Sequence, residues 1–309
     1  MEKTKRKLHL ALGGGGARGL AHIGVLKVIE EEGLPIARLS GTSGGAVIAA
    51  LFAQTGRVQE VYERMQRFIR SEAFKEFGLD LFREEESEKD SYWDRVENLL
   101  RYLRSRLIYT RVLISESIFP AERFIELLHE LYDDVDIEDV RWPLQIAAVN
   151  VDTGEDVLIR RGNLIRAVAA SSAIPGLVSP VEFEGQRLID GAVTQSVPIP
   201  PVNRHREVLV AVDVSRHIRA DYPKRLALEY IFRAEEIATF RLNQMHLQKA
   251  EVVVHPEEVR QRHWADFSRL DDFVQSGERA ARHKLKEIRK AMAAQESWLK
   301  LWLRERLCA

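Results

Sequence analysis

Two glycine-rich turns near the N-terminus constrain the fold of this chain more than any other feature. The first, Gly13–Gly16, follows the short apolar segment Leu8–Leu12, and the second, Gly41–Gly45, follows Ile36–Ser40. Each turn precedes a segment in which apolar residues recur at helical spacing. A strand, a tight turn and a helix therefore occur twice within about fifty residues, which is typical of an α/β sheet with parallel strands.

The rest of the chain alternates between helical and strand patterns. Residues 57–141 have mainly helical periodicity and predict an insertion of helices. A turn at Thr153-Gly154 predicts a hairpin between Leu144–Asn150 and Val157–Arg160. Further strands are expected at Val181–Phe183, Arg187–Ile189, Val208–Val212 and Val252–Val254, and a helix capped by Asn163 at Leu164–Ala170.

No linker or repeat divides the chain. We therefore expect a single domain over residues 1–309. Residues 8–56 would carry the two glycine turns, 57–141 the helical insertion, 142–256 the remainder of the sheet, and 257–309 the C-terminal helices.

Charge and cysteine content exclude several classes of protein. The net charge is -1, from 46 Lys+Arg against 47 Asp+Glu, which argues against a dedicated nucleic-acid binder. The single cysteine, Cys308, allows no internal disulfide and no cysteine-built metal site, and it favours a reducing, cytoplasmic setting. The longest apolar run is about half the length needed to cross a bilayer. We expect a soluble protein, or one that contacts a membrane only peripherally.

The second glycine turn fits the pattern G-x-S-x-G, with Ser43 at its centre. Ser43 falls where a predicted strand meets a predicted helix, which is the setting of a nucleophile elbow. Gly41 and Gly45 would let neighbouring backbone approach without Cβ clashes. Taken alone, the motif is compatible both with a nucleophilic serine and with an ordinary glycine-rich turn between a strand and a helix.

Gly14, Gly16 and Gly19 form a G-x-G-x-x-G pattern between the first predicted strand and helix. The amides of such a turn hold a pyrophosphate in dinucleotide-binding folds, or an oxyanion in acyl hydrolases. The dinucleotide interpretation requires an acidic residue about twenty positions later, at the tip of the second strand. Here that strand ends in Ser40-Gly41, so we disfavour a nucleotide-dependent oxidoreductase and expect an oxyanion loop.

Asp190 follows the short strand Arg187–Ile189 and precedes Gly191 and Ala192. An aspartate in this position often does no more than form a turn. Its occurrence after an oxyanion-type loop and an elbow serine changes that interpretation. The segments LALGGGGARGLAHIGVL, GTSGGAVIAAL, AVAASSAIPGLVSPV and DGAVTQSVP, taken in this order, resemble the patatin-like phospholipase family, most closely its bacterial and neuropathy-target-esterase-like branch.

The resemblance implies a three-layer α/β/α sandwich with a mostly parallel sheet. It also implies a serine acyl hydrolase of lipid or lysophospholipid esters that needs no metal or organic cofactor. By the same resemblance Ser43 is the nucleophile, Asp190 is its base, and no catalytic histidine takes part. The oxyanion loop would comprise Gly14, Gly15, Gly16 and Arg18, supported by the motif residues Gly19, Gly41, Gly45, Gly191 and Ala192.

Three alternatives remain open from the sequence. A non-catalytic lipid-binding or regulatory protein could share the fold. A Ser-Asp-His triad could draw on the histidines after Asp190, namely His205, His217, His246, His255, His263 and His283. Arg18 could be a salt-bridge partner, or could face an anion at the start of the first helix.

Charge is unevenly distributed along the chain. An acidic run spans Glu84–Asp90, whereas Arg279–Leu307 is a basic stretch with apolar residues at helical spacing. A basic amphipathic helix can lie on an anionic bilayer or pack against its own protein, and we favour packing. Acyl-chain length, head group and oligomeric state are not predicted by any of these patterns.

Overall fold

An eight-stranded mixed sheet forms the centre of the computed structural model, which describes residues 6–79, 117–218 and 227–294. Its strands are β1 Lys7–Leu12, β2 Ile36–Thr42, β3 Leu144–Asn150, β4 Asp156–Ile159, β5 Val181–Phe183, β6 Gln186–Asp190, β7 Glu207–Val212 and β8 Val252–Val254. They are hydrogen-bonded in the order β5-β6-β3-β2-β1-β7-β8, and β4 also pairs with β3. The strands β8, β7, β1, β2 and β3 are parallel to their neighbours in this order. The prediction of a mostly parallel sheet is confirmed.

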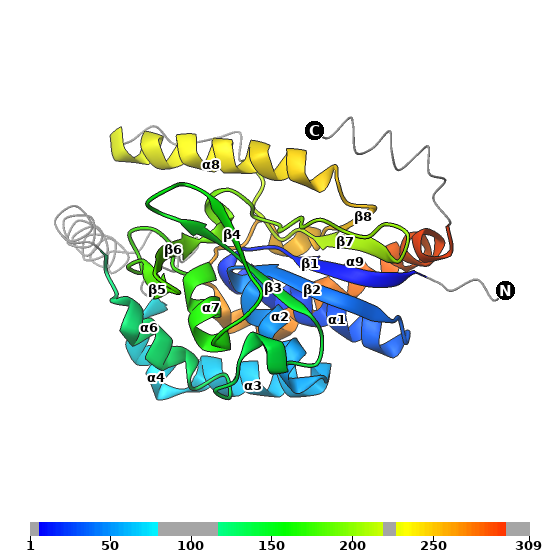
Figure 1. Cartoon of the computed structure of the whole chain (residues 1–309), viewed down its shortest axis with the longest axis horizontal. Coiled ribbons are helices and arrows are strands. Elements are labelled where there is room, and N and C mark those ends of the chain that lie inside the picture. The colour runs from blue at the N-terminus through cyan, green and yellow to red at the C-terminus, as the bar shows by residue number, and fades with distance from the viewer. Residues whose placement is uncertain (1–5, 80–116, 219–226, 295–309) are drawn as a thin grey trace, which may run out of the picture.

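Helices cover both faces of this sheet. They are α1 Ala21–Glu31, α2 Gly44–Thr55, α3 Val58–Arg70, α4 Glu72–Phe77, α6 Ala121–Leu128, α7 Leu164–Ser171, α8 Ala227–Leu247 and α9 Leu270–Ala293. Figure 1 shows α1, α2 and α7 against one face, with α3, α4 and α6 outside them, and α8 over the opposite face. The expected three-layer α/β/α arrangement is therefore confirmed.

Strand β1 is buried on both faces, as expected of a central parallel strand. Leu8, Leu10 and Leu12 lie in the main core beneath the helices. Ala11 points to the other face, where it joins a smaller apolar cluster that includes Leu247 from the last turn of α8. Burying one leucine side chain contributes about 1.5–3 kcal/mol, so this strand anchors the sheet from both sides.

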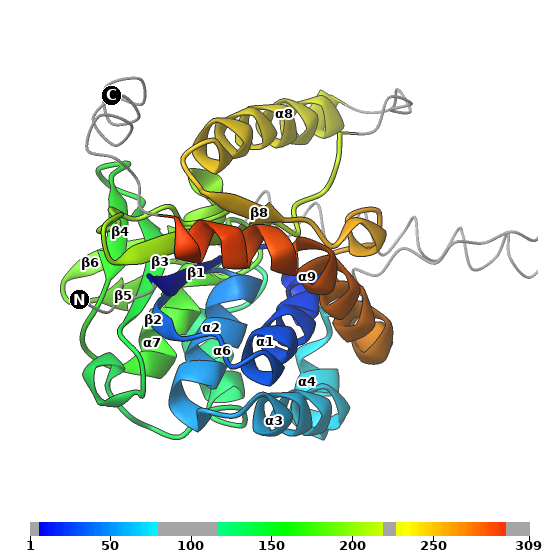
Figure 2. The ribbon, with the colours of Figure 1, turned by 90° about the vertical axis from the view of Figure 1, so that its right-hand side faces the viewer.

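Two glycines allow α1 and α9 to cross with their backbones in contact (Figure 2). A Cβ at Gly24 would lie 1.9 Å from a backbone oxygen of α9, and a Cβ at Gly277 would lie 1.9 Å from a backbone oxygen of α1. Beside this crossing, the exposed residues Arg282 and Arg289 form ion pairs with the acidic end of α1. The described part of the basic C-terminal stretch thus packs against its own protein, and residues 295–309 lie outside the described residues.

The described part of the predicted insertion consists of α3, α4 and α6, with the 3-10 turn Ile137–Asp139. Val61, Met65 and Phe68 form the buried face of α3. The acidic run that begins at Glu84 lies outside the described residues. In the described part of the chain, no helix combines the length and apolar character needed to cross a membrane.

Candidate active site

Ser43 lies in the strained turn that joins β2 to α2. Its backbone has φ 51° and ψ -126°, a combination that favours glycine and that costs a non-glycine residue about 1–3 kcal/mol. The residue is 95% buried, with an exposed fraction of 5%. The nucleophile-elbow geometry expected from the sequence is present.

The glycines on both sides of Ser43 are required by close packing. A Cβ at Gly41 would lie 2.5 Å from the Ala46 Cα, and one at Gly45 would lie 2.1 Å from the Leu12 oxygen. Neither contact is compatible with a side chain. The flanking glycines therefore allow the elbow to sit directly against β1 and the first turn of α2.

Two strands that run toward each other bring Ser43 and Asp190 together. β2 is parallel to β3 and ends with Thr42 opposite Ala147, whereas β6 is antiparallel to β3 and ends with Asp190 opposite Ala148. β4 occupies the opposite edge of β3 at both positions. The ends of β2 and β6 therefore meet on one edge of β3, and the residues at these ends become neighbours.

Asp190 is a buried carboxylate with altered acidity. Burial raises its pKa to about 6, although hydrogen bonds from the Ala192 amide and the Ser43 side chain lower it in part. The Ala192 amide donates to Asp190 Oδ1 over 2.8 Å. A carboxylate with this pKa is a better proton acceptor than an exposed aspartate, and it is still ionised at neutral pH.

The first glycine turn packs against Ser43. A Cβ at Gly14 would lie 3.2 Å from the Ser43 Cβ. The Gly13 and Gly14 amides already donate to the Val212 and Ser196 carbonyls, over 2.9 and 2.7 Å. Gly14 therefore contributes space beside Ser43 and no free donor, a refinement of the prediction from sequence.

The Gly15 and Gly16 amides have no acceptor among the described residues. Gly16 also lines the same pocket as Ser43. A Cβ at Gly19 would lie 3.0 Å from backbone atoms of Gly44, so Gly19 lets the 3-10 turn Gly16–Leu20 pack onto the start of α2. A Cβ at Gly44 would lie 3.2 Å from the Gly16 nitrogen, so the Gly16 amide is held close to the elbow.

Arg18 belongs to this loop in sequence but does not line the pocket of Ser43. Its Nη1 donates to the Arg262 carbonyl over 3.3 Å. Burial, followed by the charge of Arg216, lowers its pKa to about 10. Among the described residues, no carboxylate lies within ion-pair distance of Arg18. Arg18 therefore packs behind the loop. Its contacts match neither a salt bridge nor an anion-facing position at the start of the first helix, the two roles considered from the sequence.

Two residues near the site were not identified as important from the sequence. The Ser171 hydroxyl accepts from the Ser43 amide over 2.9 Å and donates to the Ala147 carbonyl over 2.6 Å. The His22 Nε2 donates to the Gly13 carbonyl over 2.7 Å. Burial lowers the pKa of His22 to about 4, so the ring is neutral at neutral pH. In the sequence, Ser171 and His22 were visible only as members of the quoted segments AVAASSAIPGLVSPV and LALGGGGARGLAHIGVL.

Ser43 opens into an apolar pocket with about 770 Å³ of empty space, including its mouth. Most of the lining comes from leucine, isoleucine, valine, methionine, phenylalanine and tryptophan side chains of α2, α3, α4, α6 and neighbouring segments. Ser172 is a polar exception, since it lines the pocket and its buried hydroxyl finds no hydrogen-bond partner among the described residues. The pocket is suited to an alkyl chain.

The histidines that could have completed a triad lie elsewhere. All six fall within the described residues, and none of them lines the pocket of Ser43. His217 contacts Glu257 over 3.1 Å, and His255 contacts Asp213 over 3.3 Å. The described residues also contain no group of three or more side chains that could hold a metal ion.

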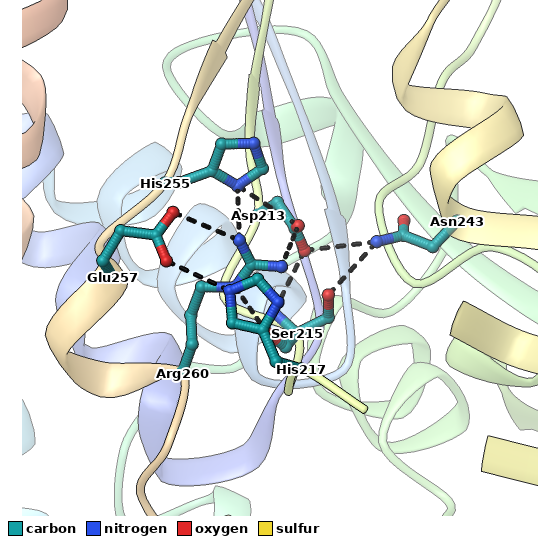
Figure 3. A network of polar contacts seen from close by, with 7 residues as sticks. All are labelled: Asp213, Ser215, His217, Asn243, His255, Glu257 and Arg260. Carbon is teal, nitrogen blue, oxygen red and sulfur yellow. Dashed lines mark hydrogen bonds and ion pairs between the residues drawn. The ribbon is translucent and has the colours of Figure 1, made fainter. Parts of the chain in front are cut away.

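A polar network beside the glycine loop joins β7, β8 and α8 (Figure 3). At its centre Asp213 accepts from the Ser215 amide over 3.0 Å and from Asn243 over 3.2 Å, and its other oxygen lies 3.3 Å from Arg260. Burial alone would raise the pKa of Asp213, but hydrogen bonds and the Arg260 charge lower it to about 2. A Cβ at Gly15 would lie 2.9 Å from Val214, so the network supports the flank of the loop.

Comparison with known proteins gives a family match. A family model described as patatin-like phospholipase matches residues 10–202. An uncharacterized NTE family protein of Mycobacterium tuberculosis is 30% identical over 196 residues, which are 63% of this chain and 45% of that protein. Lysophospholipase nte1 of Aspergillus fumigatus is 30% identical over 211 residues, which are 68% of this chain and 12% of that protein. The chain thus spans less than half the length of these curated relatives.

Among solved structures, VipD from Legionella pneumophila aligns with a TM-score of 0.43 and 14% sequence identity. The alignment covers 92% of this chain and 67% of that one.

Proposed function

Because this chain belongs to the patatin-like phospholipase family, we propose that it is a serine acyl hydrolase that cleaves carboxylic esters of lipids. The observation that carries the proposal is the pairing of an elbow serine with a buried carboxylate at the mouth of an apolar pocket. Ser43 is the nucleophile and Asp190 its base. The names of the lysophospholipase relatives point to the same class of reaction.

The first half of the reaction forms an acyl-enzyme. Asp190 accepts the hydroxyl proton of Ser43 while Oγ attacks the ester carbonyl. The Gly15 and Gly16 amides stabilise the negative charge that develops on the carbonyl oxygen. One donor of this kind contributes about 10²- to 10³-fold in rate. The tetrahedral intermediate then collapses, and the alkoxide leaving group takes the proton from Asp190.

The second half releases the acid. A water molecule gives a proton to Asp190 and attacks the acyl carbonyl, and the same amides stabilise the second oxyanion. When this intermediate collapses, the proton returns to Ser43 Oγ. Two residues and two amides suffice for this cycle because Asp190 alternates between base and acid, so neither a histidine nor a metal enters it.

The character of the pocket favours recognition of the substrate through its acyl chain. Its walls are apolar, whereas its few polar groups gather near Ser43. An alkyl chain would be buried at about 25 cal/mol for each Å² of apolar surface removed from water. The leaving group, a glycerophosphate derivative or another alcohol, would stay outside. Substrates of this class reside in membranes, so we expect contact with a lipid surface during turnover.

Hydrolysis of p-nitrophenyl butyrate and of a lysophosphatidylcholine by wild type, Ser43→Ala and Asp190→Asn tests the proposal. We expect both variants to lose at least 10³-fold in kcat. Fluorophosphonate labelling should require Ser43. Ser179→Ala, which changes a serine outside the pocket, is the matched control and should retain activity.

Three outcomes would replace the proposal. Full activity in Ser43→Ala, or labelling that survives it, would exclude this nucleophile. If a variant of one of the six later histidines lost as much activity as Ser43→Ala, a triad would take the place of the dyad. A wild type that binds lysophosphatidylcholine without cleaving either ester would indicate the non-catalytic lipid-binding alternative.

A further inference from the structure

The segment that joins β8 to α9 packs against the outside of the first glycine turn. The Trp264 carbonyl accepts from the Ala17 amide over 2.6 Å. Ala17 directly follows Gly15 and Gly16, whose amides have no acceptor among the described residues. Trp264 thus contacts the turn next to its two unused donors, and it lies beyond residues 10–202, which the family model matches.

Gly16 allows Trp264 to come this close. Its φ is 58°, in the left-handed region that favours glycine. A Cβ at Gly16 would lie 2.4 Å from the Trp264 oxygen and 3.3 Å from the Trp264 Cβ. The backbones of the two residues therefore pack directly against each other, and a shift of either one would displace the other.

The side chain of Trp264 lies on the inner side of the same segment. It is half-buried, packs against the main core and lines the pocket of Ser43. Phe267, three residues later, lines the same pocket and meets Phe74 edge to face, with ring centroids 5.1 Å apart. Trp264 therefore contacts the first glycine turn through its main chain and the apolar pocket through its side chain.

Both ends of the segment are anchored. Arg260 is 3% exposed, donates to the Ser215 carbonyl over 2.9 Å and lies 3.3 Å from Asp213 (Figure 3). At the other end Leu270 begins α9, which crosses α1 with the two backbones in contact. Because its ends are held, the segment cannot move away as a whole, and a force on the indole of Trp264 is transmitted to the turn.

We propose that Trp264 is a positioning residue that couples the occupancy of the pocket to the first glycine turn. The coupling rests on the proposed function, which assigns the pocket to the acyl chain and the Gly15 and Gly16 amides to the oxyanion. An acyl chain that packs on the indole immobilises Trp264, and the Trp264 carbonyl then holds the Ala17 amide and the two donors before it. A chain too short to pack on the indole leaves the turn less firmly held.

Chain length should therefore act on kcat as well as on KM. Binding energy from a part of the substrate remote from the reacting bond raises kcat only when it is realised in the transition state. The oxyanion develops only there, so better placement of its donors has this effect. One complete donor contributes about 10²- to 10³-fold in rate, and a partial gain in placement is consistent with about 10-fold.

Hydrolysis of p-nitrophenyl esters from butyrate to decanoate, below the concentrations at which they form micelles, tests the coupling. In the wild type we expect kcat to rise about 10-fold along the series. In Trp264→Ala the kcat for decanoate should fall to a value close to that of the same variant for butyrate. Trp264→Phe keeps an aromatic ring in the pocket and should restore most of the rise.

Phe267→Leu is the matched control. Phe267 lines the pocket from the same segment, but it is the Trp264 carbonyl that accepts from the turn. Phe267→Leu should raise the KM for decanoate, because the chain loses apolar contact, and it should keep the rise in kcat from butyrate to decanoate. Circular dichroism checks that each variant is folded.

Two ketones separate the turn from the pocket wall. A long-chain alkyl trifluoromethyl ketone adds to Ser43: a bond forms between Oγ and the carbonyl carbon, the hydroxyl proton passes to Asp190, and the carbonyl oxygen becomes an oxyanion. The methyl ketone of the same chain length fills the pocket without this addition. Trp264→Ala should weaken binding of the trifluoromethyl ketone about 10-fold more than that of the methyl ketone.

A wild-type kcat that is equal for butyrate and decanoate contradicts the coupling, as does a rise in kcat that survives in Trp264→Ala. Equal losses of affinity for the two ketones would show that the indole is only a part of the pocket wall. A wild type that cleaves none of the esters would overturn the proposed function itself. A wild type that cleaves all of them with the same kcat would overturn the coupling alone.

Discussion

The hydroxyl of Ser171 holds the backbone amide of Ser43 at 2.9 Å, and the same hydroxyl donates to β3. One side chain therefore ties the end of α7, the middle of the sheet and the strained elbow together. The strained backbone conformation of Ser43 persists only if surrounding contacts stabilise it by more than the strain costs. Ser171 is the residue that makes such a contact to the amide of Ser43 itself.

Ser171→Ala should lower kcat about 10-fold and change KM little, because it loosens the nucleophile without altering the pocket. It should also cost about 1–3 kcal/mol of unfolding free energy, since a buried amide loses its acceptor. Ser179→Ala is the matched control, because Ser179 accepts from the Ala121 amide over 2.8 Å and does not line the pocket. Ester hydrolysis and urea unfolding measure both effects. An equal loss of kcat in the two variants would show that Ser171 contributes only to stability.

Activity should rise with pH through a single ionisation near 6. Asp190 must be unprotonated to accept the Ser43 proton, and burial raises its pKa to about 6. Below that pH the base is protonated, so kcat/KM should fall about 10-fold for each further pH unit. The dependence of kcat/KM on pH, measured with p-nitrophenyl butyrate, tests this prediction. A profile that stays flat down to pH 4.5 would argue against Asp190 as the base.

Asp190→Asn should be inactive and more stable than wild type at pH 7.5. The folded pKa of about 6 lies above the ordinary aspartate pKa of 3.8, so between these values the folded state binds more protons than the unfolded state. The ionised carboxylate therefore costs stability that is absent below pH 3.8 and complete above pH 6, on the order of 3 kcal/mol. Thermal melts of both proteins should differ at pH 7.5 and converge toward pH 4.5. A variant less stable than wild type at pH 7.5 would contradict this.

His22 should make the protein sensitive to acid. Its folded pKa of about 4 lies below the ordinary histidine pKa of 6.5, so the stability it contributes is complete above pH 6.5 and is lost as the pH falls toward 4. His22→Gln keeps a donor for the Gly13 carbonyl and does not titrate, so its unfolding free energy should fall less over that window. His22→Phe removes the donor and should have the lower kcat of the two. Equal kcat values would show that the contact with Gly13 does not position the loop.

Met65 should control the length of the acyl chain. It lies on α3, is 2% exposed and lines the pocket. Met65→Trp adds bulk to the pocket, so kcat/KM for esters of twelve or more carbons should drop about 10-fold while the butyrate ester is still cleaved. Met65→Leu conserves volume and should change neither value much. If Met65→Trp affected both esters equally, the chain would bind elsewhere or the variant would be misfolded.

The features that could be predicted from sequence are those that short segments encode. The strand ahead of Ser43, its flanking glycines and the turn at Asp190 each depend on a few adjacent residues, so turn chemistry identified them. The hairpin and the Asn163 cap, which accepts from the Arg166 amide over 3.0 Å, were predicted for the same reason. The mostly parallel character of the sheet followed from the repeated strand, turn and helix.

The features that could not be predicted depend on contacts between distant segments. The Gly14 amide is used by the Ser196 carbonyl, and only the register of β1 with β7 brings those segments together. The hydrogen bond from the Ser43 amide to the Ser171 hydroxyl likewise depends on how α7 packs on β3. The apolar residues of α8 are visible in the sequence. Which side of the helix faces the rest of the protein, however, depends on the hydrogen bond that Asn243 donates to Asp213.

Because the ends of β2 and β6 meet on β3, the site can form only late during synthesis of the chain. The strands that carry Ser43 are complete within the first fifty residues, but Asp190 can reach its place only after β3 has joined the sheet and β6 has paired with it. A chain still emerging from the ribosome therefore carries Ser43 before Asp190 can lie beside it. If these two residues act as we propose, the site becomes competent only after β6 has paired with β3.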